Sequence, residues 1–158
     1  MTRSLPQADR PLPLLSTTAE YALRALAELA IAPPAEQIRS VDLAARTGVP
    51  EAYLSKVLRK LVSHGLLHGS KGHGGGFSLA KPAGRIRFID VLEAVDSMPA
   101  TERCAFGRPR CSTTNPCPLH PAWARLKHGF LEWAQTTTLA EVTGGAARGG
   151  SSRKSDRT

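Results

Sequence analysis

Residues 53–79, which read YLSKVLRKLVSHGLLHGSKGHGGGFSL, decide the fold of this chain. The first half carries apolar side chains at helical spacing, namely Leu54, Val57, Leu58, Leu61 and Val62. This stripe predicts an amphipathic helix, and Gly65 is its expected C′ residue. The short apolar segments 66–68 and 77–79 flank a glycine-rich loop over residues 70–76, a pattern typical of a β-hairpin. We therefore predict a helix followed at once by a glycine-tipped hairpin.

Two more helices are predicted before this stretch. The first runs from Thr17 to about Ile31, with Thr17-x-x-Glu20 as a capping box. Its apolar face consists of Leu15, Ala19, Ala22, Leu26 and Leu29. Ser40 is the expected N-cap of a short helix over residues 41–47, which Gly48 ends.

The two short helices around Gly48 suit a helix-turn-helix, although any antiparallel helical pair would show the same pattern. The hairpin that follows favours a winged helix, in which the second helix enters the DNA major groove and the hairpin lies on the flanking backbone. The predicted fold class is mainly α with a small β-hairpin: a winged helix-turn-helix plus a long C-terminal dimerisation helix.

The positive charge of the chain is concentrated in this region. The formal net charge is +8, and residues 52–89 hold seven basic residues and no acidic one. A cationic stretch can simply be a solvated face, but this asymmetry favours a polyanionic partner such as double-stranded DNA. The candidate DNA contacts on the helix and hairpin are Tyr53, Ser55, Lys56, Arg59, Lys60, Lys71, His73, Gly74 and Gly75. We expect Ser55 and Lys56 to reach base edges, and Arg59 and Lys60 to contact phosphates.

Other classes of protein are disfavoured. No apolar run approaches the length of a membrane span, and the N-terminus lacks the pattern of a signal peptide. Three cysteines, an odd number, argue against a disulfide framework, so we expect a cytoplasmic protein. His73 to Gly76 match the HGGG string of some esterases, but the chain has no G-x-S-x-G nucleophile motif and no Walker loop. An enzyme is not expected.

Downstream, we predict a helix over residues 89–95, an irregular loop and a long helix from Pro121. The long helix carries a heptad-like seam of Leu119, Trp123, Leu126, Phe130, Trp133 and Thr137. This seam could pack on the first helix, but a two-fold helix-turn-helix protein needs a homodimer interface, which we favour. The expected parts are a disordered head (1–13), a winged domain (14–95), a cysteine-containing loop (96–120), the dimerisation helix and end segment (121–143) and a disordered basic tail (144–158).

The cysteines predict a metal centre. Cys104-x6-Cys111-x5-Cys117-x2-His120 places three thiols and an imidazole close together in a proline-rich stretch. Such a set suits an iron–sulfur cluster or Zn²⁺, and the lack of a C-x2-C pair favours the larger cluster. Redox-active thiols without a metal are a further alternative, and His120 could be only a residue at the start of a helix.

Several segments together resemble the IscR/NsrR-type family of winged-helix iron–sulfur transcription regulators. They are residues 15–26 (LSTTAEYALRAL), 53–61 (YLSKVLRKL), 71–80 (KGHGGGFSLA), 89–95 (IDVLEAV) and 138–142 (TLAEV). The resemblance implies a homodimeric repressor or activator on a pseudo-palindromic operator, whose DNA occupancy depends on a 2Fe–2S or 4Fe–4S cluster.

The same resemblance assigns ligands to this cluster. Cys104, Cys111 and Cys117 match the three thiolates of the family. The fourth ligand is His120 if the chain follows IscR-like members, or the partner subunit's Glu20 if it follows NsrR-like members; we favour His120. The chain departs from the family in its six-residue gap between the first two cysteines.

Overall fold

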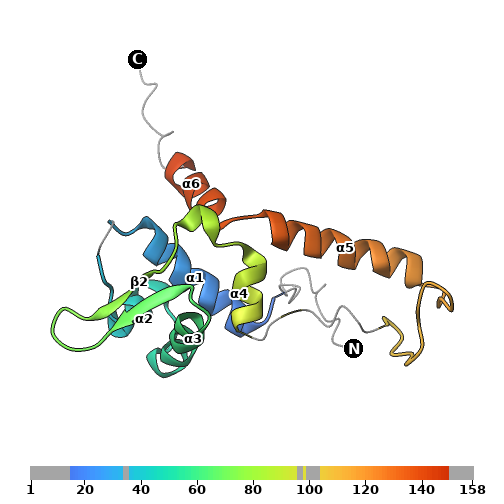
Figure 1. The fold of residues 1–158 in the computed structure, drawn as a ribbon, viewed down its shortest axis with the longest axis horizontal. Coiled ribbons are helices and arrows are strands. Elements are labelled where there is room, and N and C mark those ends of the chain that lie inside the picture. The colour runs from blue at the N-terminus through green and yellow to red at the C-terminus, as the bar shows by residue number, and fades with distance from the viewer. Residues whose placement is uncertain (1–14, 34–35, 96–97, 99–103, 150–158) are drawn as a thin grey trace, which may run out of the picture.

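The computed structural model describes residues 15–33, 36–95, 98 and 104–149. The elements, in chain order, are α1 (Thr17–Ile31), α2 (Ser40–Thr47), α3 (Glu51–Ser63), β1 (Leu67–Ser70), β2 (Gly76–Leu79), a 3₁₀ turn (Ala83–Arg85), α4 (Phe88–Ala94), α5 (His120–Thr136) and α6 (Leu139–Gly149). Figure 1 shows α1 to α4 and the hairpin gathered in one body, from which α5 extends to one side. The predicted head, residues 1–13, lies outside the described residues, as do residues 150–158 of the predicted tail.

The helix starts differ in detail from the sequence prediction. The capping box at Thr17 is wrong, because Ser16 is the N-cap: its Oγ accepts a hydrogen bond from the Ala19 N–H at 3.1 Å. Ser40 is not the cap of α2 but its first residue, after Arg39. The end of α2 is as predicted, since Gly48 adopts the left-handed conformation that a helix C-cap favours, with φ of 70°.

The core lies between α1, α2, α3 and α4. Its fully buried large side chains include Leu26, Leu43, Leu54, Leu58, Leu61 and Leu92. The stripe predicted on α3 is buried except for Val62, which is half-buried. Packing this stripe inward turns the opposite, polar face of α3 toward solvent, which is the arrangement that a reading helix needs.

The hairpin follows α3 as predicted. β1 and β2 pair antiparallel, with Leu67 opposite Leu79 and Ser70 opposite Gly76. The sequence did not indicate a further bridge, in which Ile38 pairs with Phe77 through two backbone hydrogen bonds of 3.0 and 2.8 Å. This bridge ties the hairpin to the segment between α1 and α2. The winged helix-turn-helix fold is therefore present.

α4 begins one residue earlier than predicted because Arg87 caps it. The backbone N–H of Arg87 donates to Asp90 Oδ2 at 2.9 Å, and its guanidinium donates to both carboxylate oxygens of Asp90. This capping box sets the first turn of the helix. It also pairs Arg87, one of the seven basic residues of the cationic stretch, with a carboxylate.

The long helix α5 packs on α4 near its C-terminal end. The rings of Phe88 and Trp133 lie 4.9 Å apart in an edge-to-face arrangement, and Ala134 is fully buried. The predicted seam is only partly covered: Trp123 and Phe130 are half-buried, whereas Leu119, Leu126 and Trp133 are 46%, 60% and 41% exposed. Within the described chain, α5 therefore packs on α4, which leaves much of its apolar seam uncovered.

The second C-terminal helix, α6, was not predicted. It continues to Gly149, six residues into the segment assigned to the basic tail. Its start is capped by Glu141, whose Oε2 accepts from the Thr138 N–H at 2.6 Å, and α6 lies against α1 and the 3₁₀ turn. Capping and packing outweigh the low helix propensity of the glycines. No helix in the described part of the chain is long and apolar enough to cross a membrane.

Candidate metal centre and nucleic-acid interface

The fold brings the three cysteine thiols together. The Sγ atoms of Cys104, Cys111 and Cys117 all lie within 4.8 Å of one another, and those of Cys104 and Cys117 are 3.6 Å apart. Cys117 is buried, while the other two are partly exposed. Tight backbone turns shape the loop, including the Gly107 N–H to Cys104 carbonyl bond of 2.9 Å. In Figure 1 this loop lies at the end of α5 that is remote from the hairpin.

His120 lies beside one of the three thiols, although it is not part of the group that the three sulfurs form. It is the first residue of α5, and its Nδ1 lies 3.1 Å from the Sγ of Cys111. Two sulfurs on one tetrahedral zinc ion are about 3.8 Å apart, given Zn–S bonds of about 2.3 Å. The Cys104–Cys117 distance of 3.6 Å is close to that value. Three thiols so arranged, with an imidazole beside one of them, fit zinc or iron in an iron–sulfur cluster.

The thiols differ in acidity. Burial raises the pKa of the Cys104 thiol, but hydrogen bonds from the backbone of Arg108 and Phe106 and from the neighbouring thiols outweigh it and lower the pKa to about 7. At Cys111 the backbone of Cys117 favours the thiolate, whereas burial and the other two sulfurs oppose it and leave the pKa raised. Cys104 therefore ionises before Cys111, and thiolates are the form that binds metal.

Glu20, the other candidate ligand, does not join the thiols of its own chain. It lies on α1, 4.0 Å from Arg24 in an exposed ion pair, and is not part of the group formed by the three sulfurs. Figure 1 shows α1 within the body and the cysteine loop at the far end of α5. Within one chain, Glu20 is therefore not placed to bind a metal at the three thiols.

On α3, the predicted DNA contacts lie on the polar face. Lys56, Arg59 and Lys60 are exposed and Ser55 is half-buried. Tyr53 is exposed too, but its hydroxyl hydrogen-bonds Thr18 Oγ1 of α1 and its ring meets the edge of Tyr21. The sequence carried no local signal for this contact, which joins residues 35 positions apart.

On the wing, Lys71, His73 and Gly74 are exposed around the hairpin tip. At two of the adjoining glycines, the packing of the wing itself leaves no room for a side chain. A Cβ on Gly75 would lie 2.6 Å from the Ser70 carbonyl oxygen, and one on Gly76 would lie 2.8 Å from the backbone of Ile38. These glycines allow close backbone approach within the wing itself, whether or not a phosphate is bound.

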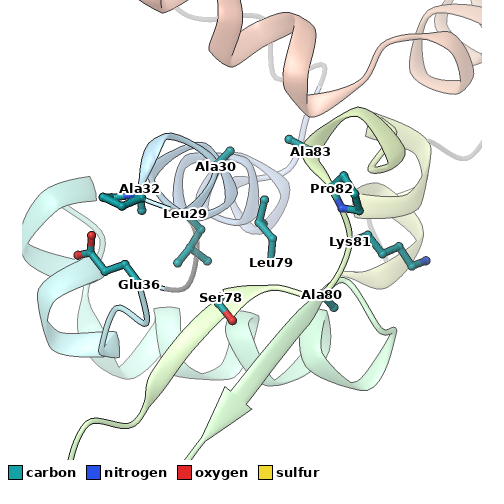
Figure 2. A pocket seen from close by; sticks show the side chains of 11 residues that line it. Leu29, Ala30, Ala32, Glu36, Ser78, Leu79, Ala80, Lys81, Pro82 and Ala83 are labelled. Carbon is teal, nitrogen blue, oxygen red and sulfur yellow. The ribbon is translucent and has the colours of Figure 1, made fainter.

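A pocket of about 590 Å³ lies elsewhere, between the end of α1 and strand β2. Figure 2 shows Leu29 and Leu79 in its middle, with Glu36 on one side and Lys81 on the other. Its lining includes none of the three cysteines and no residue of α3. The two candidate sites therefore remain the cysteine cluster and the cationic surface of α3 and the wing.

A winged helix-turn-helix with a cationic reading helix and wing defines a class of protein, the DNA-binding transcriptional regulators. Residues 15–145 match the model of the Rrf2 family, described as iron-dependent transcriptional regulators. The chain belongs to the Rrf2 family, whose members are regulators and not enzymes.

Individual relatives agree with this assignment. The chain is 35% identical over 138 residues (84% of this chain, 82% of the relative) to a Mycobacterium tuberculosis protein whose name assigns it as an HTH-type transcriptional regulator. It is 30% identical over 128 residues to the regulator IscR of Citrobacter koseri, covering 81% of this chain and 78% of that protein.

Solved structures share the fold. IscR of T. potens superposes with a TM-score of 0.69 at 22% identity, over 88% of this chain and 92% of that one. CymR, the global cysteine regulator of B. subtilis, superposes with a TM-score of 0.68 at 22% identity, over 82% of this chain and 95% of that one.

Proposed function

We propose that this protein is a homodimeric, cytoplasmic transcriptional repressor whose affinity for a pseudo-palindromic operator is controlled by an iron–sulfur cluster. One observation carries the proposal: the thiols of Cys104, Cys111 and Cys117 lie within 4.8 Å of one another. They do so in the segment that joins α4 to α5, between the DNA-binding body and the helix that we propose as the dimer interface. The iron-dependence in the description of the matched family supports the choice of metal.

The three cysteines would hold the cluster, with His120 or the partner subunit's Glu20 as fourth ligand. The 3.1 Å distance from His120 Nδ1 to Cys111 Sγ supports His120, because it places an imidazole nitrogen beside a thiol of the set. A bound cluster would supply a centre sensitive to redox state, nitric oxide or iron supply.

The open seam of α5 supports a dimer. Leu119, Leu126 and Trp133 are large apolar side chains that remain at least 41% exposed. Burying a fully exposed side chain of this kind contributes roughly 1.5–3 kcal/mol, so these partly exposed ones would each contribute about half of that, and a row of them favours association with a second copy. A two-fold dimer that pairs the α5 seams would present two α3 helices to successive major grooves, about 34 Å apart.

In each subunit, α3 and the wing would contact the operator. Ser55 and Lys56, near the start of α3, would reach base edges, while Arg59 and Lys60 would contact phosphates. On the wing, Lys71 and His73 would meet the flanking phosphate backbone, which could approach closely at the exposed Gly74. The Gly75 N–H already donates to the Gly72 carbonyl at 3.0 Å, so Gly75 would allow close approach without donating to phosphate.

The position of the cysteines suggests how ligation reaches the DNA. Cys117 is buried, and its carbonyl accepts a 2.9 Å hydrogen bond from the N–H of His120, in the first turn of α5. Holding three thiols at one centre would therefore fix the loop to that turn. With the loop fixed, α5 would point in one direction relative to its own winged body. The two winged bodies of the dimer would then be held at one angle to each other. Released thiols would leave that angle free and lower operator affinity.

The decisive experiment combines a spectrum with DNA binding. Protein purified without oxygen is expected to be red-brown and to contain iron and sulfide. Its operator affinity should exceed that of the metal-free protein and of Cys111→Ala by about 5- to 150-fold, the usual range of allosteric coupling. Thr113→Ala, an exposed neighbour in the same loop, is the matched control and should behave as wild type. Equal affinity in all forms would overturn the switch.

The same spectra test the ligand assignment. His120→Ala should lose or shift the cluster absorption if His120 is the fourth ligand, and Glu20→Ala should leave it unchanged. The reverse result would assign the partner subunit's Glu20. A colourless protein containing one zinc per chain would replace the sensor with a structural zinc site.

A further inference from the structure

The first turns of α1 and α3 are joined by a polar and aromatic contact. The Tyr53 hydroxyl and Thr18 Oγ1 are hydrogen-bonded at 2.5 Å. The Tyr53 and Tyr21 rings lie 5.4 Å apart at 86°, the edge-to-face geometry that aromatic pairs prefer. The guanidinium of Arg24 lies 6.0 Å from the centre of the Tyr21 ring and extends the contact along α1.

This contact adds a polar and aromatic link to the apolar packing of α3. The first turn of α3 has no side-chain cap, because its N-cap residue is Pro50. The buried residues Leu54, Val57, Leu58 and Leu61 hold α3 to the core. The buried stripe sets which face of α3 points to solvent. A hydrogen bond depends on distance and angle, so the Tyr53–Thr18 bond and the ring contact hold the first turn within a narrower range of positions.

We propose that Tyr53 is a positioning residue, which aligns the DNA-reading face of α3 through Thr18 and Tyr21 rather than donating its hydroxyl to DNA. The inference rests on the proposed function, since it takes α3 as the helix that reads the operator. Ser55 and Lys56 follow Tyr53 by two and three residues, so a small rotation of this turn moves both side chains across the base edges.

A double-mutant cycle separates positioning from direct contact. The variants are Tyr53→Phe, Thr18→Val and the double substitution, with Thr18→Ser as the control that keeps the hydroxyl. Tyr53→Phe keeps the aromatic ring, and Thr18→Val keeps the side-chain volume. Thermal unfolding checks that each variant is folded. Affinity is measured anaerobically for an operator that the wild type selects from random duplexes, and for a scrambled duplex, over a range of salt concentrations.

If Tyr53 acts through Thr18, both single variants lose up to about tenfold in operator affinity, and the double variant loses no more than either. Scrambled-duplex affinity and the salt dependence stay as in wild type, and Thr18→Ser binds as wild type. A direct phosphate contact predicts the opposite: Tyr53→Phe alone weakens binding to both duplexes, and Thr18→Val has no effect.

The DNA selectivity of the wild-type protein distinguishes a failure of the proposed function from a failure of the role proposed for Tyr53. A wild type without preference for any selected duplex would refute the proposed function. A wild type that selects an operator, beside variants of unchanged affinity, would refute only the positioning role of Tyr53.

Discussion

Replacing Gly76 by alanine tests how the wing is held to the body. Gly76 is buried at the start of β2. A Cβ there would lie 2.8 Å from both the carbonyl carbon and oxygen of Ile38, and 3.1 Å from the nitrogen of Arg39. All three are backbone atoms, so no side chain can rotate away to make room, and the hairpin must separate from the 38–39 segment.

The expected cost follows from the bonds that this separation breaks. The Ile38 N–H donates to the Phe77 carbonyl at 3.0 Å, and the Phe77 N–H donates to the Ile38 carbonyl at 2.8 Å. Each hydrogen bond contributes about 0.5–1.5 kcal/mol net. With added strain in the hairpin, we expect Gly76→Ala to lose about 2–3 kcal/mol of unfolding free energy. For a chain of this size the melting temperature should fall by about 4–12 °C.

Urea unfolding followed by circular dichroism measures this loss, at one fixed protein concentration because association shifts the midpoint. Gly84→Ala is the matched control: a Cβ there meets only the Ala140 side chain, at 3.9 Å. That variant should stay within about 0.5 kcal/mol of wild type. A Gly76→Ala protein as stable as the control would show that the wing is not held against Ile38 as described.

Three further predictions concern charge, association and pH. Lys71→Ala should weaken binding to every duplex alike and flatten the salt dependence by about one unit, as measured by fluorescence anisotropy. Leu126→Glu, at a position 60% exposed on α5, should shift the protein from dimer to monomer in light scattering, whereas Gln135→Glu should not. Burial opposes ionisation of Asp90, but hydrogen bonds from Arg87 outweigh it and lower its pKa. A lowered carboxyl pKa stabilises the fold at pH values above the unfolded pKa of about 3.9. Asp90→Ala should therefore lower the free energy of unfolding by about 1 kcal/mol at pH 7. Urea titrations should show this difference in stability narrowing as the pH falls through the folded pKa.

Each of these predictions has a contrary outcome. A loss of discrimination at a single base pair would mean that Lys71 reads a base instead of a phosphate. A Leu126→Glu protein that remains dimeric would place the interface away from the α5 seam. A difference between wild type and Asp90→Ala that is constant down to pH 2 would mean that the carboxylate charge does not contribute.

Local signals account for what the sequence predicted well. The helix over residues 17–31, the end of α2 at Gly48 and the buried stripe of α3 follow from apolar spacing and from a C-cap glycine, which act within a few residues. One error in the sequence prediction lies where two neighbouring residues could both cap the same helix. Ser16 and Thr17 can both cap a helix, and the side-chain bond to the Ala19 N–H selects Ser16. Helix α6 was missed because its packing on α1 is not visible in a glycine-rich segment.

The sequence alone determined the winged architecture, the cationic stretch and a cysteine and histidine set suited to a soft metal, because periodicity, charge and ligand type are properties of the residues themselves. Folding adds three contacts that the residues alone do not reveal: three sulfurs spread over 14 positions meet within 4.8 Å, Ile38 pairs with Phe77, and Tyr53 bonds Thr18. The last two contacts join segments that are distant along the chain, and the three sulfurs meet because an irregular loop turns back on itself. Their geometry depends on how the whole chain packs, which no local pattern of residues records.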